Sequence, residues 1–241
     1  MTMAMEAMAG ALALLQSAAE PLLGAHSFWV AIVLLTIAVR VLMLPLALRQ
    51  ARSTKAMRAL APQLEKLQRK YRNKPQKLAE ARMALLRAHN INPFLGWLTV
   101  LVQSPVLYVL FQTVRTPVID GVPNLLTGQA FVFGVGLDAQ WLGLVGLGAK
   151  LASPAGLTIL ALALLTGLLT YLTLRRPGSD LDSGLGGGAS SAGQLAVAQR
   201  SMRAIMPVLS AGFAVTVPLA VVLYLVTSSA WTYGQQLLLF R

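Results

Sequence analysis

The feature that most constrains this chain is an arginine inside a long apolar stretch. Residues Phe28 to Leu48 (FWVAIVLLTIAVRVLMLPLAL) are apolar apart from Thr36 and Arg40. A helix needs about 20 such residues to cross the hydrocarbon core of a bilayer, which is about 30 Å thick. The stretch therefore predicts a first transmembrane helix, TM1. The next charged residue, Arg49, follows nine positions later, which puts Arg40 about 13 Å inside the membrane.

A cation at this depth constrains function as well as fold. An arginine there costs at least about 2.5–3.5 kcal/mol on insertion scales, so it is expected to face protein or water instead of lipid. The alternative is an Arg40 side chain that snorkels to the interface, although nine residues is a long distance to reach. We interpret Arg40 as a functional arginine in a hydrated cavity.

Composition and charge agree with a membrane protein. Hydrophobic residues make up 56% of the chain and charged residues 12%, about half the charged share of soluble proteins. The chain has no cysteine and two histidines, His26 and His89, so disulfides and Cys-ligated metals are excluded. Of the 20 lysines and arginines, 12 lie between Arg49 and Arg87. Such a cluster beside a span marks the cytoplasmic side.

Periodicity and helix breakers divide the chain into successive segments. They are an external interfacial helix at 1–26, TM1 at 27–48, a cytoplasmic basic helical hairpin at 49–92, TM2 at 93–115, an external loop at 116–153, TM3 at 154–174, a flexible cytoplasmic loop at 175–203, TM4 at 204–217, and TM5 with the C-terminus at 218–241. Two alternatives stay open: a further span at 4–19, and a single long span in place of TM4 and TM5. The sequence predicts an all-α polytopic membrane protein with five transmembrane helices.

The basic segment carries two apolar stripes, each spaced three or four residues apart. They are Met57, Leu60, Leu64, Leu67 and Tyr71 in the first half, and Leu78, Ala81, Leu85 and Ala88 in the second. Arg72-Asn73-Lys74-Pro75 separates them and favours a turn. We predict an antiparallel hairpin with its stripes packed together and its basic side chains pointing away from the seam. The residues expected to contact anionic lipid headgroups or a ribosome are Arg69, Lys70, Arg72, Lys74 and Lys77. The alternative is a solvated hairpin with no partner.

Polar residues at matching depths predict a shared cavity. Gln103 lies about 13 Å from the cytoplasmic end of TM2, the same depth as Arg40. Thr36 is one turn from Arg40 on the same helix face, and Thr227 lies about 13 Å from the outer end of TM5. We expect a substrate groove lined by Arg40, Thr36, Gln103, Ser104, Thr227 and Ser228.

Four stretches between Phe28 and Gln236 form a set. They are LLTIAVRVLMLPLALRQ, NPFLGWLTVLVQSPVLYVLF, MRAIMPVLSAGFAV and PLAVVLYLVTSSAWTYGQQ. In this order and spacing they resemble the YidC-type membrane protein insertases and their mitochondrial and chloroplast relatives. The chain departs from the family in lacking the large external domain of Gram-negative members, and in having Leu225 where an aromatic residue is common.

The resemblance implies a five-helix core around a hydrophilic groove that opens to the cytoplasm and to lipid. Arg40 corresponds to the groove arginine, Gln103 to the glutamine of the second helix, and Tyr224 to the aromatic region of the last helix. The implied function is insertion of nascent or newly made membrane proteins, alone or with the Sec translocon, with ribosome docking and without any cofactor or enzymatic activity. The implied location is the bacterial plasma (inner) membrane, with the hairpin and C-terminus in the cytoplasm.

Two other classes of function are weighed against this one. A small-solute transporter or channel would use Arg40 as an anion site, but it is expected to show repeated halves with paired broken helices, and the sequence has no such repeat. An intramembrane enzyme would need a nucleophile and a base, and His89 lies in the hairpin instead. The net charge of +12 follows from topology, so we expect anionic lipids as partners and no specific nucleic-acid sequence.

Overall fold

The computed structural model describes residues 2–92, 95–116, 118–119, 122–123, 131–132, 135–136, 154–175 and 192–239. Its helices are α1 (Thr2–Leu23), the short 3-10 helix η1 (Gly24–His26), α2 (Ser27–Leu42), α3 (Leu44–Ala59), α4 (Ala61–Lys70), α5 (Pro75–Ala88), α6 (Leu95–Arg115), α8 (Pro154–Arg175), α10 (Ala192–Ala214) and α11 (Leu219–Leu239). Two short antiparallel pairs join them, β1 (Val118–Ile119) with β2 (Val122–Pro123) and β3 (Phe131–Val132) with β4 (Val135–Gly136). Most of the predicted external loop, and residues 176–191 of the predicted flexible loop, lie outside the described residues.

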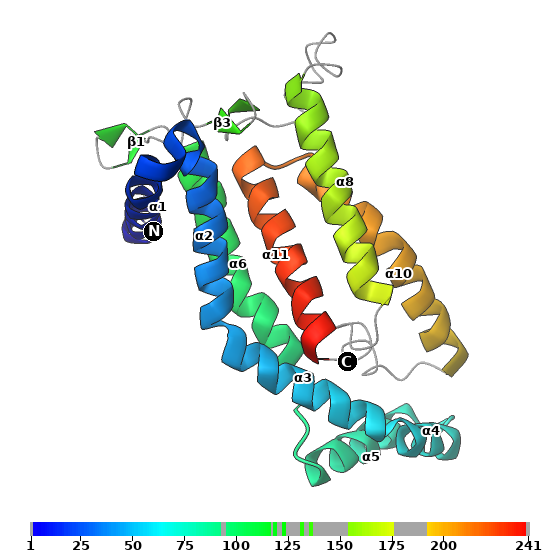
Figure 1. Cartoon of the computed structure of the whole chain (residues 1–241). Helices are drawn as coiled ribbons and strands as arrows, with labels where there is room; N and C mark the ends of the chain where they lie inside the picture. The colour runs from blue at the N-terminus through cyan, green and yellow to red at the C-terminus, as the bar shows by residue number, and fades with distance from the viewer. Residues whose placement is uncertain are drawn as a thin grey trace.

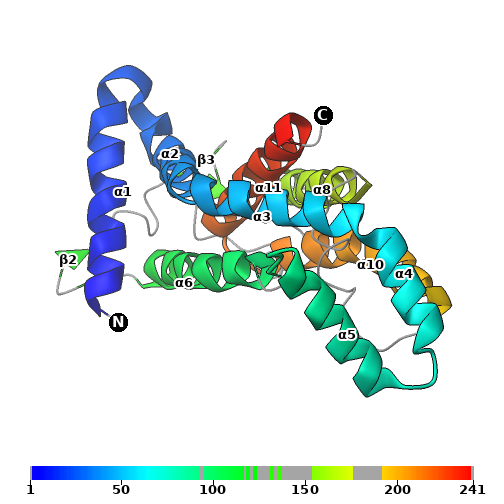
Figure 2. The same cartoon turned by 90° about the horizontal axis from the view of Figure 1, so that it is seen from below.

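The helices form a bundle with different structures at its two ends. In Figure 1, α2, α6, α8, α10 and α11 extend along the bundle, the strands lie at one end, and α4 and α5 lie at the other. Helix α1 is seen end-on in Figure 1 and lengthwise in Figure 2, so it lies across the bundle at the strand end. Gly24 permits the sharp turn from α1 to α2 because its φ is +51°, a left-handed conformation that glycine adopts without steric cost.

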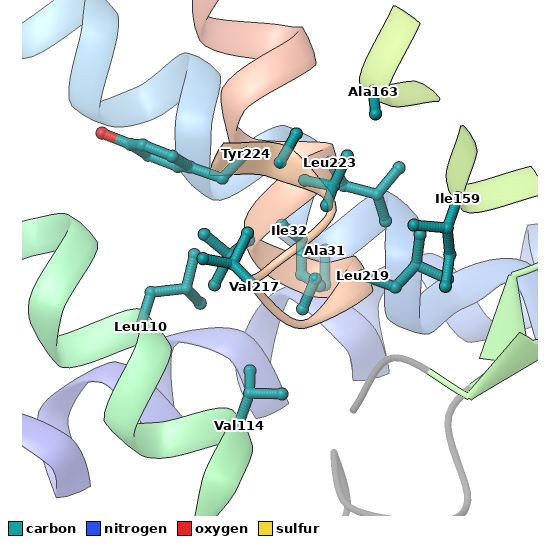
Figure 3. Packing of buried hydrophobic residues seen from close by; sticks show 14 of the residues in the cluster. Ala31, Ile32, Leu110, Val114, Ile159, Ala163, Val217, Leu219, Leu223 and Tyr224 are labelled. Atoms are coloured by element: carbon teal, nitrogen blue, oxygen red, sulfur yellow. The ribbon is translucent and has the colours of Figure 1, made fainter. Parts of the chain in front are cut away.

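The main hydrophobic core lies at the strand end of the bundle. It is built on the first turns of α11, where Leu219 and Val222 are fully buried, and it receives Ile32 from α2 and Val114 from α6. Figure 3 shows Ile159 and Ala163 of α8 completing the cluster. Six helices, α1, α2, α6, α8, α10 and α11, therefore contribute to one packed, apolar layer at this end.

TM1 was predicted as one helix, and this prediction is wrong at its end. Helix α2 ends at Leu42, and α3 begins at Leu44 with its axis bent by 55°. Pro45 lies in the first turn of α3. Its ring cannot donate a backbone hydrogen bond and clashes with the preceding turn, so the chain bends at Met43 and then continues as a helix.

By length and hydropathy, α8 is the one helix of the described residues that can cross a membrane alone, through Gly156–Arg175. The bent pair of α2 and α3 passes the same test when it is taken together. Helices α6 and α11 have 21 residues each, about 31 Å, which is long enough to cross the hydrocarbon core. Five transmembrane helices therefore stay a prediction.

The C-terminal part forms two helices joined by a short turn. Helix α10 ends at Ala214 and α11 begins at Leu219, and both pack against α8. The prediction of a flexible loop up to residue 203 is wrong in its last part, because α10 already begins at Ala192. The sequence there (AGQLAVAQRSMRA) is rich in alanine, glutamine and arginine, which favour helix formation.

The basic segment is an antiparallel helical hairpin. Its first arm is divided at Leu60 because Pro62 lies in the first turn of α4, and its turn spans residues 71–74. The seam buries Leu60, Leu86 and Ile91. Around these residues lie Ala56, Met57, Leu64 and Leu85. The expected pairing of the stripes is thus observed in part, but Ala88 is exposed and Leu86 and Ile91 fill the seam instead.

The end of α5 explains the position of Ile91. Asn90 has a φ of 54°, and the Ile91 amide donates to the Leu86 carbonyl at 2.9 Å. This is the hydrogen bond of a Schellman cap, in which a hydrophobic contact commonly joins the same two positions. The cap turns the chain from the hairpin towards α6 and places Ile91 over Leu86.

We expect Leu86→Ala to loosen the hairpin and to leave the bundle folded. Leu86 is 5% exposed, and truncating a buried leucine to alanine destabilises by about 2–5 kcal/mol. Hydrogen exchange of α4 and α5 amides measures the effect, with exposed Gln76→Ala on the same helix as the control. Unchanged protection in Leu86→Ala would contradict the importance of this seam.

Candidate functional site

The candidate site centres on a hydrogen bond between the two helices α2 and α11. Arg40 is in the last turn of α2 and is partly buried. Its Nε donates to Ser228 Oγ at 3.2 Å, and Ser228 is 3% exposed. Helices α2 and α11 pack against each other and both lead away from the apolar core. The hydrogen bond lies eight residues beyond Ile32 on α2, about 12 Å.

Thr36 and Tyr224, two other predicted groove residues, are buried. Thr36 is 1% exposed, and its hydroxyl donates to the Ile32 carbonyl of its own helix at 2.7 Å. Tyr224 is 3% exposed and belongs to the hydrophobic core. In Figure 3 its hydroxyl points away from the other labelled side chains. Thr227 is partly buried on α11 beside Ser228.

The two predicted groove residues of α6 differ in how far they are buried. Gln103 is partly buried on α6, which packs against α3 and α11. Ser104 is exposed, and its hydroxyl donates to the Leu101 carbonyl at 3.3 Å within the same helix. The structure thus brings Arg40 and Ser228 into direct contact, and it does not place Ser104 in a buried site.

Helix α11 also carries a polar stripe of which only Ser228 was predicted from the sequence. Ser228, Thr232 and Gln236 follow each other at intervals of four residues, so they share one helix face. The Thr232 hydroxyl donates to the Ser228 carbonyl at 2.9 Å, and Gln236 is 7% exposed. Gln236 Oε1 and the indole nitrogen of Trp231 are buried and have no hydrogen-bond partner among the described residues. The spacing of four was the signal in the sequence that could have found the stripe.

This polar stripe, Ser228–Thr232–Gln236, runs from Arg40 towards the end of the bundle where α11 ends. Buried polar groups are costly unless they are hydrogen-bonded. A face of this kind is suited to bind polar backbone or side-chain groups. It is separated from the strand end by the apolar layer around Leu219 and Val222.

The predicted contact residues of the hairpin are all at its surface. Arg69, Lys70, Arg72, Lys74 and Lys77 are exposed. Lys70 Nζ lies 5.3 Å from the centroid of the Tyr71 ring, within the range of a cation–π contact. The turn therefore presents a compact group of cations to solvent.

Arg82 contradicts the expectation that all basic residues point away from the seam. It lies on α5 between Leu78 and Leu86, one turn from each, and both leucines are buried. Arg82 itself is partly buried, and burial lowers the pKa of its guanidinium group. Its charge is therefore partly removed from water.

Within the part of the chain that the structure describes, no cluster of three or more His, Cys, Asp or Glu side chains is arranged to hold a metal ion. The site consists of one cation, hydroxyl groups and amides. Groups of this kind donate and accept hydrogen bonds.

The fold and the site define a helical membrane protein with a cation on a polar face inside its bundle. The chain matches the family described as the 60Kd inner membrane protein over residues 19–241. It belongs to this family, the YidC-type membrane protein insertases.

Three relatives illustrate the match. The chain is 27% identical to the membrane protein insertase YidC of Streptomyces avermitilis, over 90% of this chain and 53% of that protein. It is 30% identical to YidC of Oceanobacillus iheyensis, over 89% of this chain and 75% of that protein. With the insertase MisCA of Bacillus subtilis it shares 40% identity over 39% of this chain and 38% of that protein. The chain spans about half the length of the Streptomyces relative.

Proposed function

We propose that this chain is a membrane protein insertase that moves short polar segments of newly made membrane proteins across the bilayer. The observation that carries the proposal is the hydrogen bond from Arg40 to Ser228 at 3.2 Å, located where the polar stripe begins. The names of its relatives support the same activity. The protein acts as a multi-pass protein of the bacterial inner membrane, with its hairpin and C-terminus in the cytoplasm.

The physical basis is a shorter path through hydrocarbon. A polar segment must otherwise cross about 30 Å of apolar core. A groove lined by Arg40, the polar stripe and Gln103 gives the segment hydrogen-bond partners for part of this distance. The positive charge of Arg40 attracts carboxylates on the segment. The apolar substrate helix then leaves sideways into lipid, where burial of its surface provides the driving force.

The apolar core gives this groove a direction. Leu219, Val222 and Ile32 are buried at the strand end and close it with apolar side chains. A polar segment therefore enters the groove from the end where the hairpin lies. We infer that five helices span the membrane, that the strand end faces outwards, and that ribosomes, the Sec translocon and anionic lipids are partners at the hairpin end.

A photocrosslinking experiment tests the proposed activity. A benzophenone amino acid in place of Thr232, on the polar stripe, is expected to crosslink a ribosome-bound nascent membrane protein. The same group in place of Leu164, which is 61% exposed on α8, serves as the control for contact with the outside of the bundle. Absence of a Thr232 adduct, or an equal adduct with a nascent soluble protein, would argue against an insertase groove.

The tip of the hairpin is expected to bind anionic partners. Deleting Lys70 to Lys77 removes four basic residues, each worth about 1 kcal/mol near an anionic surface. We expect weaker association with ribosomes or anionic vesicles and an unchanged bundle, measured by co-sedimentation at low and high salt. Association that is unaffected by the deletion and by salt would mean that the cluster only sets topology.

A further inference from the structure

The hairpin contains a hollow that the proposed function does not use. It has a volume of about 370 Å³ and is lined by Gln63, Lys66, Leu67, Lys70, Ala81 and Leu85. The first four come from α4 and the last two from α5, so the hollow lies across the two arms of the hairpin. Figure 2 shows these arms side by side beyond the helical bundle.

The hollow combines an apolar floor with a cationic edge. Leu67, Ala81 and Leu85 provide the apolar floor, and Lys66 and Lys70 are exposed along the edge. None of the six lining residues is acidic. Arg82 follows Ala81 on α5, and its partial burial adds a poorly solvated cation to the same part of the hairpin.

The spacing of the lining residues favours a helical ligand. Gln63, Lys66, Leu67 and Lys70 stand at positions i, i+3, i+4 and i+7 and so share one face of α4. This edge is about 10 Å long, and the two lysines are one turn apart, about 6 Å. A partner helix with carboxylates one turn apart matches that spacing, and apolar anchors at i and i+3 or i+4 are how amphipathic helices occupy such grooves.

From this geometry we propose that the hollow between α4 and α5 is a docking site for an acidic amphipathic helix of a partner protein. The apolar side chains of that helix fill the floor at Leu67, Ala81 and Leu85, while its carboxylates pair with Lys66 and Lys70. The volume, at the lower end of the range for ligand pockets, accommodates a few apolar side chains. The site is separate from Arg40 and shares only Lys70 with the basic tip of the hairpin, and it does not depend on insertase activity.

The test uses the full chain in nanodiscs of zwitterionic lipid and a fluorescein-labelled 16-residue amphipathic peptide. The peptide carries leucines at i, i+3 and i+4 and glutamates flanking them, and binding is followed by anisotropy. We expect the double variant K66E/K70E to weaken binding by at least about tenfold. The control R72E/K74E makes the same change in net charge at the turn and is expected to weaken it by less than about threefold.

A second pair of variants tests whether the peptide occupies the hollow, without any change in charge. Ala81→Trp fills the floor without changing charge and is expected to weaken binding at least about fivefold, whereas Ala79→Trp, on the exposed side of the same helix, leaves it within about twofold. Circular dichroism verifies that each variant keeps its helix content. Leu67→Gln, a milder change in the floor, is expected to weaken binding in the same direction.

Three results would overturn the proposal. Equal losses in the two charge variants would show that binding depends only on net charge. Equal binding by the two tryptophan variants would show that the hollow is not occupied. If anionic vesicles, and not the peptide, respond selectively to the Lys66, Lys70 and Ala81 variants, the hollow binds lipid instead of a protein helix.

Discussion

Arg40→Glu is expected to reduce insertion of a substrate with an acidic external tail at least about tenfold, while Arg40→Lys retains most of it. Two unit charges about 4 Å apart interact by about 4 kcal/mol at an effective dielectric constant of 20, and charge reversal turns this attraction into repulsion. Arg40→Ala is expected to give an intermediate loss. Lysine keeps the charge but loses the planar group that donates to Ser228.

Protease protection of the tail in inverted vesicles or proteoliposomes measures this effect. A substrate with a neutral tail is the matched control, because its insertion does not depend on attraction to Arg40. Ser228→Ala removes the hydrogen-bond partner of Arg40 and is expected to have a smaller effect, since the charge is kept. Equal insertion of the acidic substrate by wild type and Arg40→Glu would refute the electrostatic role.

Gly167→Leu is expected to destabilise the packing of α8 against α10. A Cβ atom at Gly167 would lie 3.0 Å from the Pro207 carbonyl oxygen and 3.1 Å from Ala211 Cβ. Both neighbours are close to the helix backbone, so the two helices would have to separate. Overpacking of this kind costs about 1–3 kcal/mol, and we expect a thermal midpoint lower by several degrees.

Gly212→Leu is the matched control, since it makes the same substitution in α10 itself. A Cβ atom there has no other atom within 4 Å, so the midpoint is expected to stay within about a degree of wild type. The comparison is made by thermal denaturation in detergent, followed by circular dichroism. Equal midpoints for the two variants would show that α8 and α10 do not approach as closely as the structure indicates.

Local signals predicted much of the fold. The turn in the hairpin follows from Asn73 and Pro75, which favour a turn and a helix start, and the structure has its turn there. Pro218 likewise precedes α11. Arg40 and Ser228 were predicted to line the same cavity. That prediction used the rise of a helix per residue to convert sequence position into depth in the membrane.

Tertiary context decided what local signals could not. Pro45 was visible in the sequence, but a proline near a helix end is compatible with either a kink or a new start, and only the structure shows the bend at Met43. Leu86 replaces Ala88 in the seam because the left-handed Asn90 turns Ile91 back onto the hairpin. The rotation of Ser104 away from the buried site depends on how α6 packs against its neighbours, which spacing alone does not reveal.

The junction at Met43 also has a mechanical consequence. Helices α2 and α3 meet there without a loop, so a change in the angle between α2 and α3 is a rotation about this one residue. Helix α3 has 16 residues, about 24 Å, so a change of 10° at the junction moves its far end by about 4 Å. Arg40 lies three residues before this pivot. A rotation at Met43 therefore moves the far end of α3 by several ångströms and the nearby Arg40 by much less.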